Sequence, residues 1–341
     1  MMKAIGLYHP LPVDDPDALV DLELPVPEAS GHDLLVHVHA IAVNPIDTKV
    51  RRRPLPEGDN SRVLGWDAAG EVIAVGAGCK LFKPGDRVFY SGELTRPGCN
   101  AEYQLVDERI VGHMPASLDF AQAAALPLTA VTAWESLFDR LGIAQDAEAN
   151  RGKTLLIIGG AGGVGSIAIQ LARQVAGITV VATASRPESK TWVESRGAQH
   201  VVDHRQPLPS QMAALGIAPD YILCCSDTSS YFSAMAEMIR PQGRVCVLVD
   251  ATGAVDINLF KGKSAAVVWE SMFTRALFRT DDMSQQQHIL EQVAQLADAG
   301  ALKTTLSQTL SPISAANLRE AHARLESGST IGKIVLSGWH Q

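Results

Sequence analysis

The chain has 341 residues, of which 46% are hydrophobic and 19% are charged. This composition is typical of a globular protein with one large domain or two ordinary ones. The net charge of −8 argues against a general surface for nucleic acid or for anionic membranes, so we expect neither partner. The five cysteines lack the close, paired spacing of a disulfide framework or a metal site. The sequence has neither a signal-peptide pattern nor an apolar run long enough to span a membrane. We therefore expect a reduced cytoplasmic protein.

The first 126 residues have the pattern of a β-rich domain. Short apolar or alternating runs, separated by Pro and Gly turns, predict strands over residues 3–8, 34–43, 68–75, 86–90 and 101–106. In the second of these, His37 and His39 alternate with apolar residues and so share one face of the strand. Because no third ligand follows nearby, we interpret this face as exposed rather than as a metal site.

From about residue 127, strands and helices alternate along the chain. The predicted strands cover 154–158, 179–183, 200–202, 221–225 and 244–249, and the predicted helices cover 129–141, 166–175, 188–195 and 231–239. This alternation is typical of a doubly wound parallel sheet, which binds ligands at the carboxyl ends of its strands. Two helices over 284–299 and 314–326 and a strand over 334–336 complete an α/β protein.

A glycine-rich turn separates the strand 154–158 from the helix that follows it. Gly160, Gly162 and Gly165 form a Gly-x-Gly-x-x-Gly pattern, which in this context predicts a dinucleotide site. The first glycine permits the tight turn, the second lets the backbone approach a pyrophosphate, and the third lets the helix pack close. The helix N-terminus supplies N–H groups and a positive dipole end. The alternative is a plain glycine-rich turn.

The end of the second strand of this unit indicates which nucleotide is bound. NAD sites usually carry a carboxylate there, but this chain has Ser185 and Arg186, with Lys190 one helical turn later. Cations attract a 2′-phosphate and a carboxylate would repel it, so the sequence favours NADP(H) over NAD. The alternative is that Arg186 and Lys190 only begin a solvated helix.

Several segments resemble the medium-chain dehydrogenase/reductase superfamily. They are Val-Asn-Pro-Ile-Asp at 43–47, Leu-Gly-Trp-Asp-Ala-Ala-Gly at 64–70, Val-Gly at 75–76, Lys-Pro-Gly-Asp-Arg-Val at 83–88, the run 124–132, and Gly-Lys at 332–333. The resemblance implies a GroES-like catalytic domain over 1–126, completed by about 270–341, and an NADP-binding Rossmann domain over 127–269. Within the superfamily the chain is similar to quinone oxidoreductases and zinc-type alcohol dehydrogenase-like proteins. The resemblance also implies a homodimer.

The resemblance argues against a bound metal. Zinc-dependent members have a Cys at the position of Asn44 and Gly-His-Glu at the position of Gly-Trp-Asp 65–67. They also carry a lobe of four cysteines, where this chain has Cys99 alone. Trp66 cannot ligate a metal and Asn44 is a poor zinc ligand, so we expect none.

The resemblance also implies which residues line the site. Asn44 is expected beside the nicotinamide, or else is only a turn residue before Pro45, and Asp47 is expected near the pocket. Trp66 is expected either as an aromatic wall or in the core. The Tyr90 hydroxyl is expected either to donate to a substrate oxygen or to lie at the core edge. The residues implied for the cofactor, besides Asn44, are Thr129, Gly160, Ala161, Gly162, Gly163, Val164, Gly165, Ser185, Arg186, Lys190, His204, Cys225, Ser226, Val249, Asp250 and Lys333.

Together these features predict an enzyme that transfers a hydride from NADPH, without zinc, to a quinone or an α,β-unsaturated carbonyl. Such acceptors spread the negative charge onto an oxygen that a few hydrogen-bond donors stabilise. The alternatives are a zinc-free alcohol or aldehyde dehydrogenase and a non-catalytic NADPH-binding protein.

Overall fold

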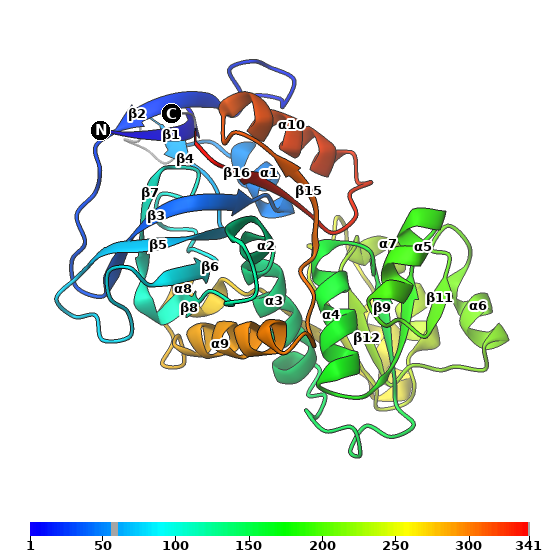
Figure 1. Ribbon diagram of the computed structural model, residues 1–341. Coiled ribbons are helices and arrows are strands. Elements are labelled where there is room, and N and C mark those ends of the chain that lie inside the picture. The colour runs from blue at the N-terminus through cyan, green and yellow to red at the C-terminus, as the bar shows by residue number, and fades with distance from the viewer. Residues whose placement is uncertain (56–60, 340–341) are drawn as a thin grey trace. The chain divides into compact units, whose positions relative to one another are not determined.

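The computed structural model describes residues 1–55 and 61–339. The chain forms two compact units, one made of Met1–Leu128 with Phe273–Gln341 and the other of Thr129–Met272 (Figure 1). The first unit is therefore built from both ends of the chain, and the second is one continuous segment. The fold is the predicted one, with a GroES-like β-rich unit and a Rossmann unit. No helix in the described part of the chain is long and apolar enough to cross a membrane.

Strand β3 (Asp33–Ala42) organises the main sheet of the first unit. It pairs antiparallel with β5 (Ala68–Val75), β7 (Tyr103–Asp107) and β16 (Lys333–Ser337). Strands β6 (Arg87–Tyr90) and β8 (Val111–His113) extend the sheet beyond β5, and β15 (Leu306–Leu310) pairs with β16 (Figure 1). A smaller sheet joins β1 (Met2–Leu7), β2 (Val20–Leu24) and β4 (Arg62–Val63). The pairing of β16 with β3 brings the C-terminal segment beside the residues that follow β3.

The helices of the first unit connect and cover these strands. They are α1 (Pro45–Arg51), α2 (Phe120–Ala124), α8 (Thr274–Phe278), α9 (Gln285–Asp298) and α10 (Ala315–Glu326), with a 3-10 turn at Glu108–Ile110. In α9, Ile289, Leu290, Val293 and Ala297 recur at helical spacing and are buried. This apolar face packs against β8, where a Cβ on Gly112 would lie 2.5 Å from the Leu290 Cβ.

The second unit is a parallel sheet in the strand order β11-β10-β9-β12-β13-β14. Its strands are β9 (Thr154–Ile158), β10 (Thr179–Thr183), β11 (His200–Val202), β12 (Tyr221–Cys224), β13 (Arg244–Val247) and β14 (Ala266–Trp269). This is the Rossmann order, in which the chain reverses direction across the sheet between β9 and β12. Every residue of β9 is buried, as expected for a strand at the centre of a parallel sheet.

The helices of the second unit are α4 (Gly163–Gln174), α5 (Pro187–Ser195), α6 (Leu208–Ala214) and α7 (Thr228–Met238), with a 3-10 turn at Ile257–Lys263. α3 (Pro127–Trp134) begins in the first unit and continues into the second as a π-helix, Glu135–Arg140. The sequence predicted one regular helix over 129–141, because apolar spacing does not distinguish a widened turn from an α-helical one.

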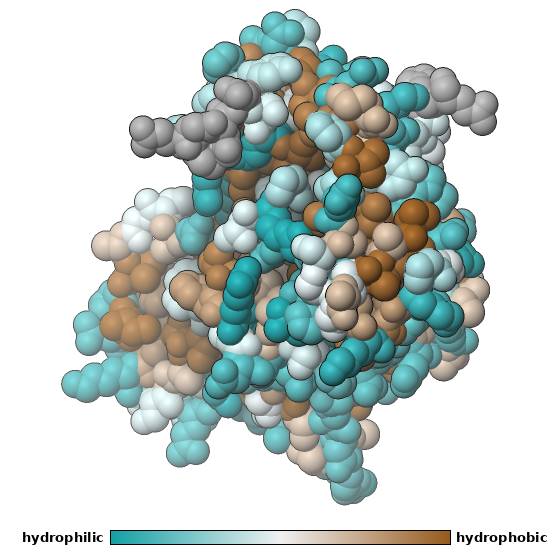
Figure 2. Space-filling model, turned by 90° about the vertical axis from the view of Figure 1, so that its left-hand side faces the viewer, coloured by the Kyte–Doolittle hydropathy of each residue, from teal (hydrophilic) through white to brown (hydrophobic). Residues whose placement is uncertain are grey.

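The predicted strands and helices all have counterparts, whereas several short elements were not predicted. β2, β4, β8, β14, β15, α1, α2 and α6 are short or half-exposed, so their periodic signal is weak. In the face shown in Figure 2, apolar side chains lie in separate groups among polar ones, which is ordinary for a folded protein.

Candidate active site

In the turn between β9 and α4, the backbone at the start of the helix lies close to the backbone at the end of the strand. Gly159 has a φ of +85°, a left-handed conformation that suits glycine. We expected Gly160 to make the tight turn, but the residue with positive φ is Gly159. A Cβ on Gly165 would lie 2.4 Å from the Gly159 carbonyl oxygen, so this glycine lets α4 pack close to the strand end.

Helix α4 begins with N–H groups that no side chain caps. Its N-cap, Gly162, is extended and has no capping side chain, so the N–H groups of the first turn point outward. Within 4 Å, a Cβ on Gly162 would meet the Gly159 carbonyl oxygen, at 3.5 Å, and the backbone is otherwise open to approach. The arrangement fits a pyrophosphate. The residues that would hold it are Gly160, Ala161, Gly162, Gly163, Val164 and Gly165.

Two further strand ends lie on the same edge of the sheet. Cys225 and Ser226 follow β12, and the Cys225 N–H donates to the Ile158 carbonyl at 2.9 Å. Burial raises the pKa of the Cys225 thiol well above its usual value. Val249 and Asp250 follow β13, which pairs in register with β12. The structure thus brings Cys225 beside the glycine turn, where a Cβ on Gly159 would lie 3.4 Å from the Cys225 Cβ. Thr129 is buried in α3 of the same unit.

A cluster of charged side chains surrounds Ser185, beyond the end of β10. Arg186 is the N-cap of α5, and Lys190 follows within that helix. Arg205, which we did not predict, donates from Nη2 to the Ser185 carbonyl at 2.6 Å. Its hydrogen bonds to Asp203 lower the pKa of that carboxyl to about 2, so Asp203 stays ionised and paired.

His204 lies in the exposed turn between Asp203 and Arg205. Arg186, Lys190 and Arg205 thus follow the ends of β10 and β11, together with Glu188 and the paired Asp203. Their guanidinium and ammonium groups are of the kind that binds a 2′-phosphate.

In the first unit, four buried polar side chains form a connected cluster after β3. Lys333, the first residue of β16, donates from Nζ to Asp67 Oδ2 at 2.7 Å and to Asn44 Oδ1 at 2.5 Å. The Asn44 Nδ2 donates to Asp67 Oδ2 at 2.8 Å and to the Ala42 carbonyl at 3.3 Å. Asp67 Oδ1 accepts from the Leu128 N–H at 2.7 Å. These bonds satisfy both carboxylate oxygens of Asp67, whose exposed fraction is 0%.

The Asn44 side chain takes part in this cluster through Asp67 and Lys333. Asn44 is the N-cap of α1 with an extended φ of −134°, but its amide makes no cap hydrogen bond. Instead, Asp47, the fourth member, accepts the Asn44 N–H at its Oδ2, at 2.6 Å. The backbone of Asn44 thus serves the turn before Pro45, while its amide is available to the cluster. The two expected roles of Asn44 are therefore both compatible with the structure.

The carboxyl groups of the cluster are hard to ionise. Burial raises the pKa of Asp47 to about 7, although the Asn44 N–H and the Lys333 charge oppose the rise. Burial also raises the pKa of Asp67, against the attraction of Lys333. The cluster therefore holds a proton on Asp47 over part of the neutral range, beside an ammonium that is paired with a carboxylate.

Trp66 and Tyr90 lie in the core of the first unit. The Trp66 Nε1 donates to the Glu93 carbonyl at 2.9 Å, and its ring meets Phe273 edge-to-face. The Tyr90 hydroxyl donates to Gln104 Oε1 at 2.8 Å, and its exposed fraction is 0%. Burial raises the pKa of that hydroxyl well above its usual value. These contacts favour the core roles over an aromatic wall and a substrate donor.

The donor set does not fit a zinc ion. The cluster offers an amide, an ammonium and two carboxylates, whereas zinc prefers thiolates and imidazoles. Cys99 lies beside it, but its thiol donates to the Asp67 carbonyl and its pKa is raised well above the usual value by burial. Across residues 1–55 and 61–339, no three His, Cys, Asp or Glu side chains group as a metal site.

His37 and His39 share a face of β3 as predicted, but that face is half-buried. Their rings stack on Tyr103 and Phe120 respectively, so the expected exposure is wrong. Burial and the neighbouring His37 lower the pKa of His39, which favours its neutral form. The two imidazoles are therefore part of the packing around the sheet.

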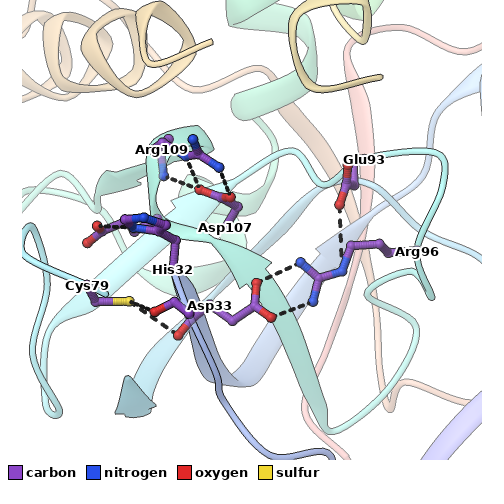
Figure 3. A network of polar contacts seen from close by, with 9 residues as sticks. His32, Asp33, Cys79, Glu93, Arg96, Asp107 and Arg109 are labelled. Atoms are coloured by element: carbon purple, nitrogen blue, oxygen red, sulfur yellow. Dashed lines mark hydrogen bonds and ion pairs between the residues drawn. The ribbon is translucent and has the colours of Figure 1, made fainter. Parts of the chain in front are cut away.

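A second polar feature of the first unit is a cavity of about 310 Å³ near the start of β3 (Figure 3). Two of its three guanidinium groups are paired with carboxylates, and Arg96 binds both carboxylate oxygens of Asp33 at 2.7 and 2.9 Å. Arg109 pairs in the same two-pronged way with Asp107, at 2.9 and 2.6 Å. These pairs join loop to strand, and we interpret them as structural. The lining consists of Ser30, His32, Asp33, Glu93, Arg96, Asp107, Arg109, Arg279 and Met283.

Sequence reasoning missed three parts of the site. It gave Asp67 no role, assigned Lys333 to the cofactor without a partner, and overlooked Arg205. A lysine opening an apolar strand was a usable signal, since a buried charge requires a partner of opposite sign. Nothing local indicated which carboxylate that partner would be.

Comparison with known proteins places the two units in one family. The pattern of the alcohol dehydrogenase GroES-like domain matches residues 30–116, and that of zinc-binding dehydrogenase matches residues 196–336. The chain is 40% identical over 337 residues to a zinc-type alcohol dehydrogenase-like protein of Staphylococcus epidermidis, covering 98% of this chain and 99% of that protein. The protein in a crystal structure from Rhizobium etli is 52% identical in sequence to this chain. The match covers 100% of this chain and 99% of that chain, with a TM-score of 0.95.

More distant relatives carry reductase names. An NADPH-dependent alkenal/one oxidoreductase of Arabidopsis thaliana is 35% identical over 238 residues, which are 67% of this chain and 58% of that protein. The structure of the quinone oxidoreductase from Coxiella burnetii is 26% identical, covers 99% of each chain and has a TM-score of 0.80. By these matches the chain belongs to the medium-chain dehydrogenase/reductase superfamily, as an oxidoreductase of the zinc-type alcohol dehydrogenase-like family.

Proposed function

We propose that this chain is an NADPH-dependent reductase that adds a hydride, without zinc, to a quinone or an α,β-unsaturated carbonyl. The observation that carries the proposal is the buried cluster of Lys333, Asp67 and Asn44, in which the cation is the Lys333 ammonium. Its polar groups suit the stabilisation of charge on an oxygen rather than the ligation of zinc. The relatives named as alkenal/one and quinone oxidoreductases support the same class of reaction.

The cofactor assignment follows from the second unit. When bound, the nicotinamide of NADPH supplies the hydride. The uncapped start of α4 would bind the pyrophosphate, and Arg186, Lys190 and Arg205 would bind the 2′-phosphate. Cys225, Ser226, Val249 and Asp250 line the adjoining strand ends, where the adenosine of such a cofactor would lie.

The acceptor class follows from the charge that develops during reduction. Hydride addition to a quinone or an enone places the negative charge on a phenolate or enolate oxygen, which a few hydrogen-bond donors stabilise. Reduction of a simple aldehyde, or oxidation of an alcohol, concentrates the charge on an alkoxide, which usually requires a Lewis acid. A site whose cation is an ammonium therefore suits the first class better.

Loss of NADPH absorbance with three acceptors tests the function. We expect turnover with a small quinone or a 2-alkenal and little with a saturated aldehyde. Turnover with the aldehyde alone would reject the proposal in favour of a zinc-free alcohol or aldehyde dehydrogenase. Tight NADPH binding without turnover of any acceptor would instead indicate a non-catalytic binding protein.

Dissociation constants for NADPH and NADH test the cofactor preference. We expect NADPH to bind roughly 10-fold or more tightly, since charged hydrogen bonds to the 2′-phosphate are absent for NADH. Arg205→Ala should reduce this ratio by removing one cation and by leaving Asp203 unpaired near the phosphate. Arg151→Ala, which removes an exposed arginine paired with Glu148, is the matched control. Equal affinity of the wild type for both nucleotides would contradict the assignment.

We also propose a cytoplasmic homodimer. β14 lies at the edge of the parallel sheet, and Trp269 at its end is 54% exposed, which suits pairing with a second copy. The five cysteines are free thiols, in keeping with a reducing compartment. Light scattering after gel filtration should give twice the chain mass, and Trp269→Glu should shift it toward one chain mass.

A further inference from the structure

The cluster after β3 has one hydrogen-bond donor to spare. An ammonium carries three N–H groups, and Lys333 directs two of them to Asn44 Oδ1 and Asp67 Oδ2. Both N–H groups of the Asn44 amide are occupied, by Asp67 and by the Ala42 carbonyl. Within residues 1–55 and 61–339, the third N–H of Lys333 meets no acceptor. Lys333 is therefore the member of the cluster that still has a charged donor to offer.

The position of this ammonium is fixed by the sheet. The Lys333 N–H donates to the Thr305 carbonyl at 2.8 Å, and the Ile334 carbonyl accepts the Val43 N–H at 3.1 Å. These bonds fix the backbone of Lys333. They also fix the backbone next to its partner Asn44, because Val43 directly precedes Asn44. A donor held in this way needs little reorganisation when charge develops next to it.

The surroundings make the ammonium sensitive to added negative charge. Asp67 balances it and is fully buried, whereas the Lys333 side chain keeps 4% of its surface exposed. Low polarity strengthens the interaction of the ammonium with a nearby oxyanion. Asp47 retains a proton over part of the neutral range, so it does not always add a competing negative charge.

We propose that Lys333 is the catalytic residue that stabilises the substrate oxygen, with Asp67 and Asn44 as its positioning residues; this inference rests on the proposed reduction. NADPH, when bound, would supply the hydride for the new C–H bond; the C=C electron pair would then move toward the carbonyl, whose oxygen would carry the charge of an enolate. The third N–H of Lys333 donates to that oxygen. A proton from water then completes the saturated carbonyl, and NADP⁺ is the other product. For a quinone, the corresponding oxygen becomes a phenolate.

The activity test uses a double variant, because Lys333→Met alone would leave Asp67 as an unpaired buried charge and destabilise the fold. In Lys333→Met/Asp67→Asn the buried ion pair is removed as a unit, so we expect a folded protein, and its kcat is measured at saturating NADPH. Its kcat should fall by about 100-fold or more, as for the loss of one oxyanion donor. Lys83→Met, which removes an exposed lysine of the same unit, is the control and should leave kcat unchanged.

A second readout does not depend on turnover. 4-Nitrophenol, bound in the presence of NADP⁺, reports the stabilisation of a phenolate oxygen through its absorption spectrum. In the wild type we expect its apparent pKa to lie below its value in water, and in the double variant we expect this depression to be lost. A wild type that fails to bind the probe, or an equal pKa in both proteins, would overturn the assignment of Lys333.

The two proposals fail in different ways. If the wild type reduces neither quinone nor enal, the proposed function is wrong. If the wild type does reduce them and the folded double variant keeps its kcat, the function stands and the role of Lys333 is wrong.

Discussion

At the scale of single residues, the site depends on buried charges that balance one another. Lys333, Asp67 and Asn44 exchange hydrogen bonds over 266 and 289 positions of the sequence. Each polar group would be costly to bury alone, and together they are nearly satisfied. What Asn44 or Lys333 does therefore depends on its partners more than on its residue type.

The proton on Asp47 makes the stability of the protein depend on pH. Its pKa is about 7 in the folded protein against a usual value of 3.8, so between these pH values the folded state keeps a proton that the unfolded chain has lost. The contribution of Asp47 to the free energy of unfolding is therefore complete below about pH 4 and is lost as the pH rises through about 7. Asp47→Asn keeps the acceptor for the Asn44 N–H but cannot titrate.

Urea titrations of both proteins at several pH values between about 4 and 8 measure this effect. The difference between the wild-type and Asp47→Asn unfolding free energies should decline across the interval. Parallel curves would show that Asp47 is already ionised in the folded protein.

Tyr90→Phe separates a structural role from a catalytic one. Removing the hydroxyl leaves Gln104 Oε1 without its donor, which should lower the free energy of unfolding by about 1–3 kcal/mol. Because the hydroxyl is buried and bonded, we expect kcat to stay at the wild-type value. Tyr8→Phe, at a 48% exposed tyrosine, is the control for stability. A loss of kcat of about 100-fold without a loss of stability would restore Tyr90 as a substrate donor.

At the scale of elements, two local arrangements carry the proposed chemistry. One is the strand, turn and helix from β9 to α4, in which a close backbone approach leaves the helix start uncapped. The other is the junction of β3, α1 and β16, where the helix cap and the strand pairing hold the cluster. The first lies in consecutive residues, and the second joins distant segments.

Two glycine substitutions test the first arrangement. A Cβ on Gly165 would lie 2.4 Å from a backbone oxygen, so Gly165→Ala should destabilise the protein by about 1–3 kcal/mol. In Gly162→Ala the new methyl group lies 3.5 Å from the Gly159 carbonyl oxygen and should cost under about 1 kcal/mol. Its methyl group would nonetheless obstruct a pyrophosphate, so NADPH affinity should fall by roughly 10-fold or more. Urea titration and NADPH binding measure both effects, and wild-type NADPH affinity in Gly162→Ala would argue against the pyrophosphate site.

At the scale of the whole molecule, the chain combines a family architecture with a donor set that does not suit zinc. Its relatives bear zinc in their names, but the cluster after β3 carries an ammonium, an amide and two carboxylates. The C-terminal segment completes this cluster, because β16 returns to β3 and places Lys333 there. Fold and family are shared with the relatives, whereas the chemistry follows from the residues of the site.

Metal analysis tests the expected absence of zinc directly. Elemental analysis of the purified protein should find far less than one zinc per chain, and prolonged treatment with a chelator should change neither the Tm nor the rate of quinone reduction. A tightly held stoichiometric zinc, whose removal abolishes turnover, would contradict a zinc-free reaction.

The sequence by itself determined the features that repeat or stand close together. The alternation of strands and helices after residue 127, the glycine turn and the basic residues after β10 are all visible locally, because helical and strand periods and turn chemistry act over a few residues. The same local signals predicted the α/β class and the nucleotide site. They did not distinguish a π-helix from an α-helix, and they missed the short strands.

Only the tertiary structure decided which distant side chains meet. The register of β16 on β3 joins Lys333 to Asn44 and Asp67, the turn after β11 brings Arg205 to Ser185, and the packing of the first unit buries Trp66 and Tyr90. Such contacts depend on strand register, where a shift of one residue would turn Lys333 to the opposite face. No local pattern encodes that register, so the partners of the buried charges became known only with the fold.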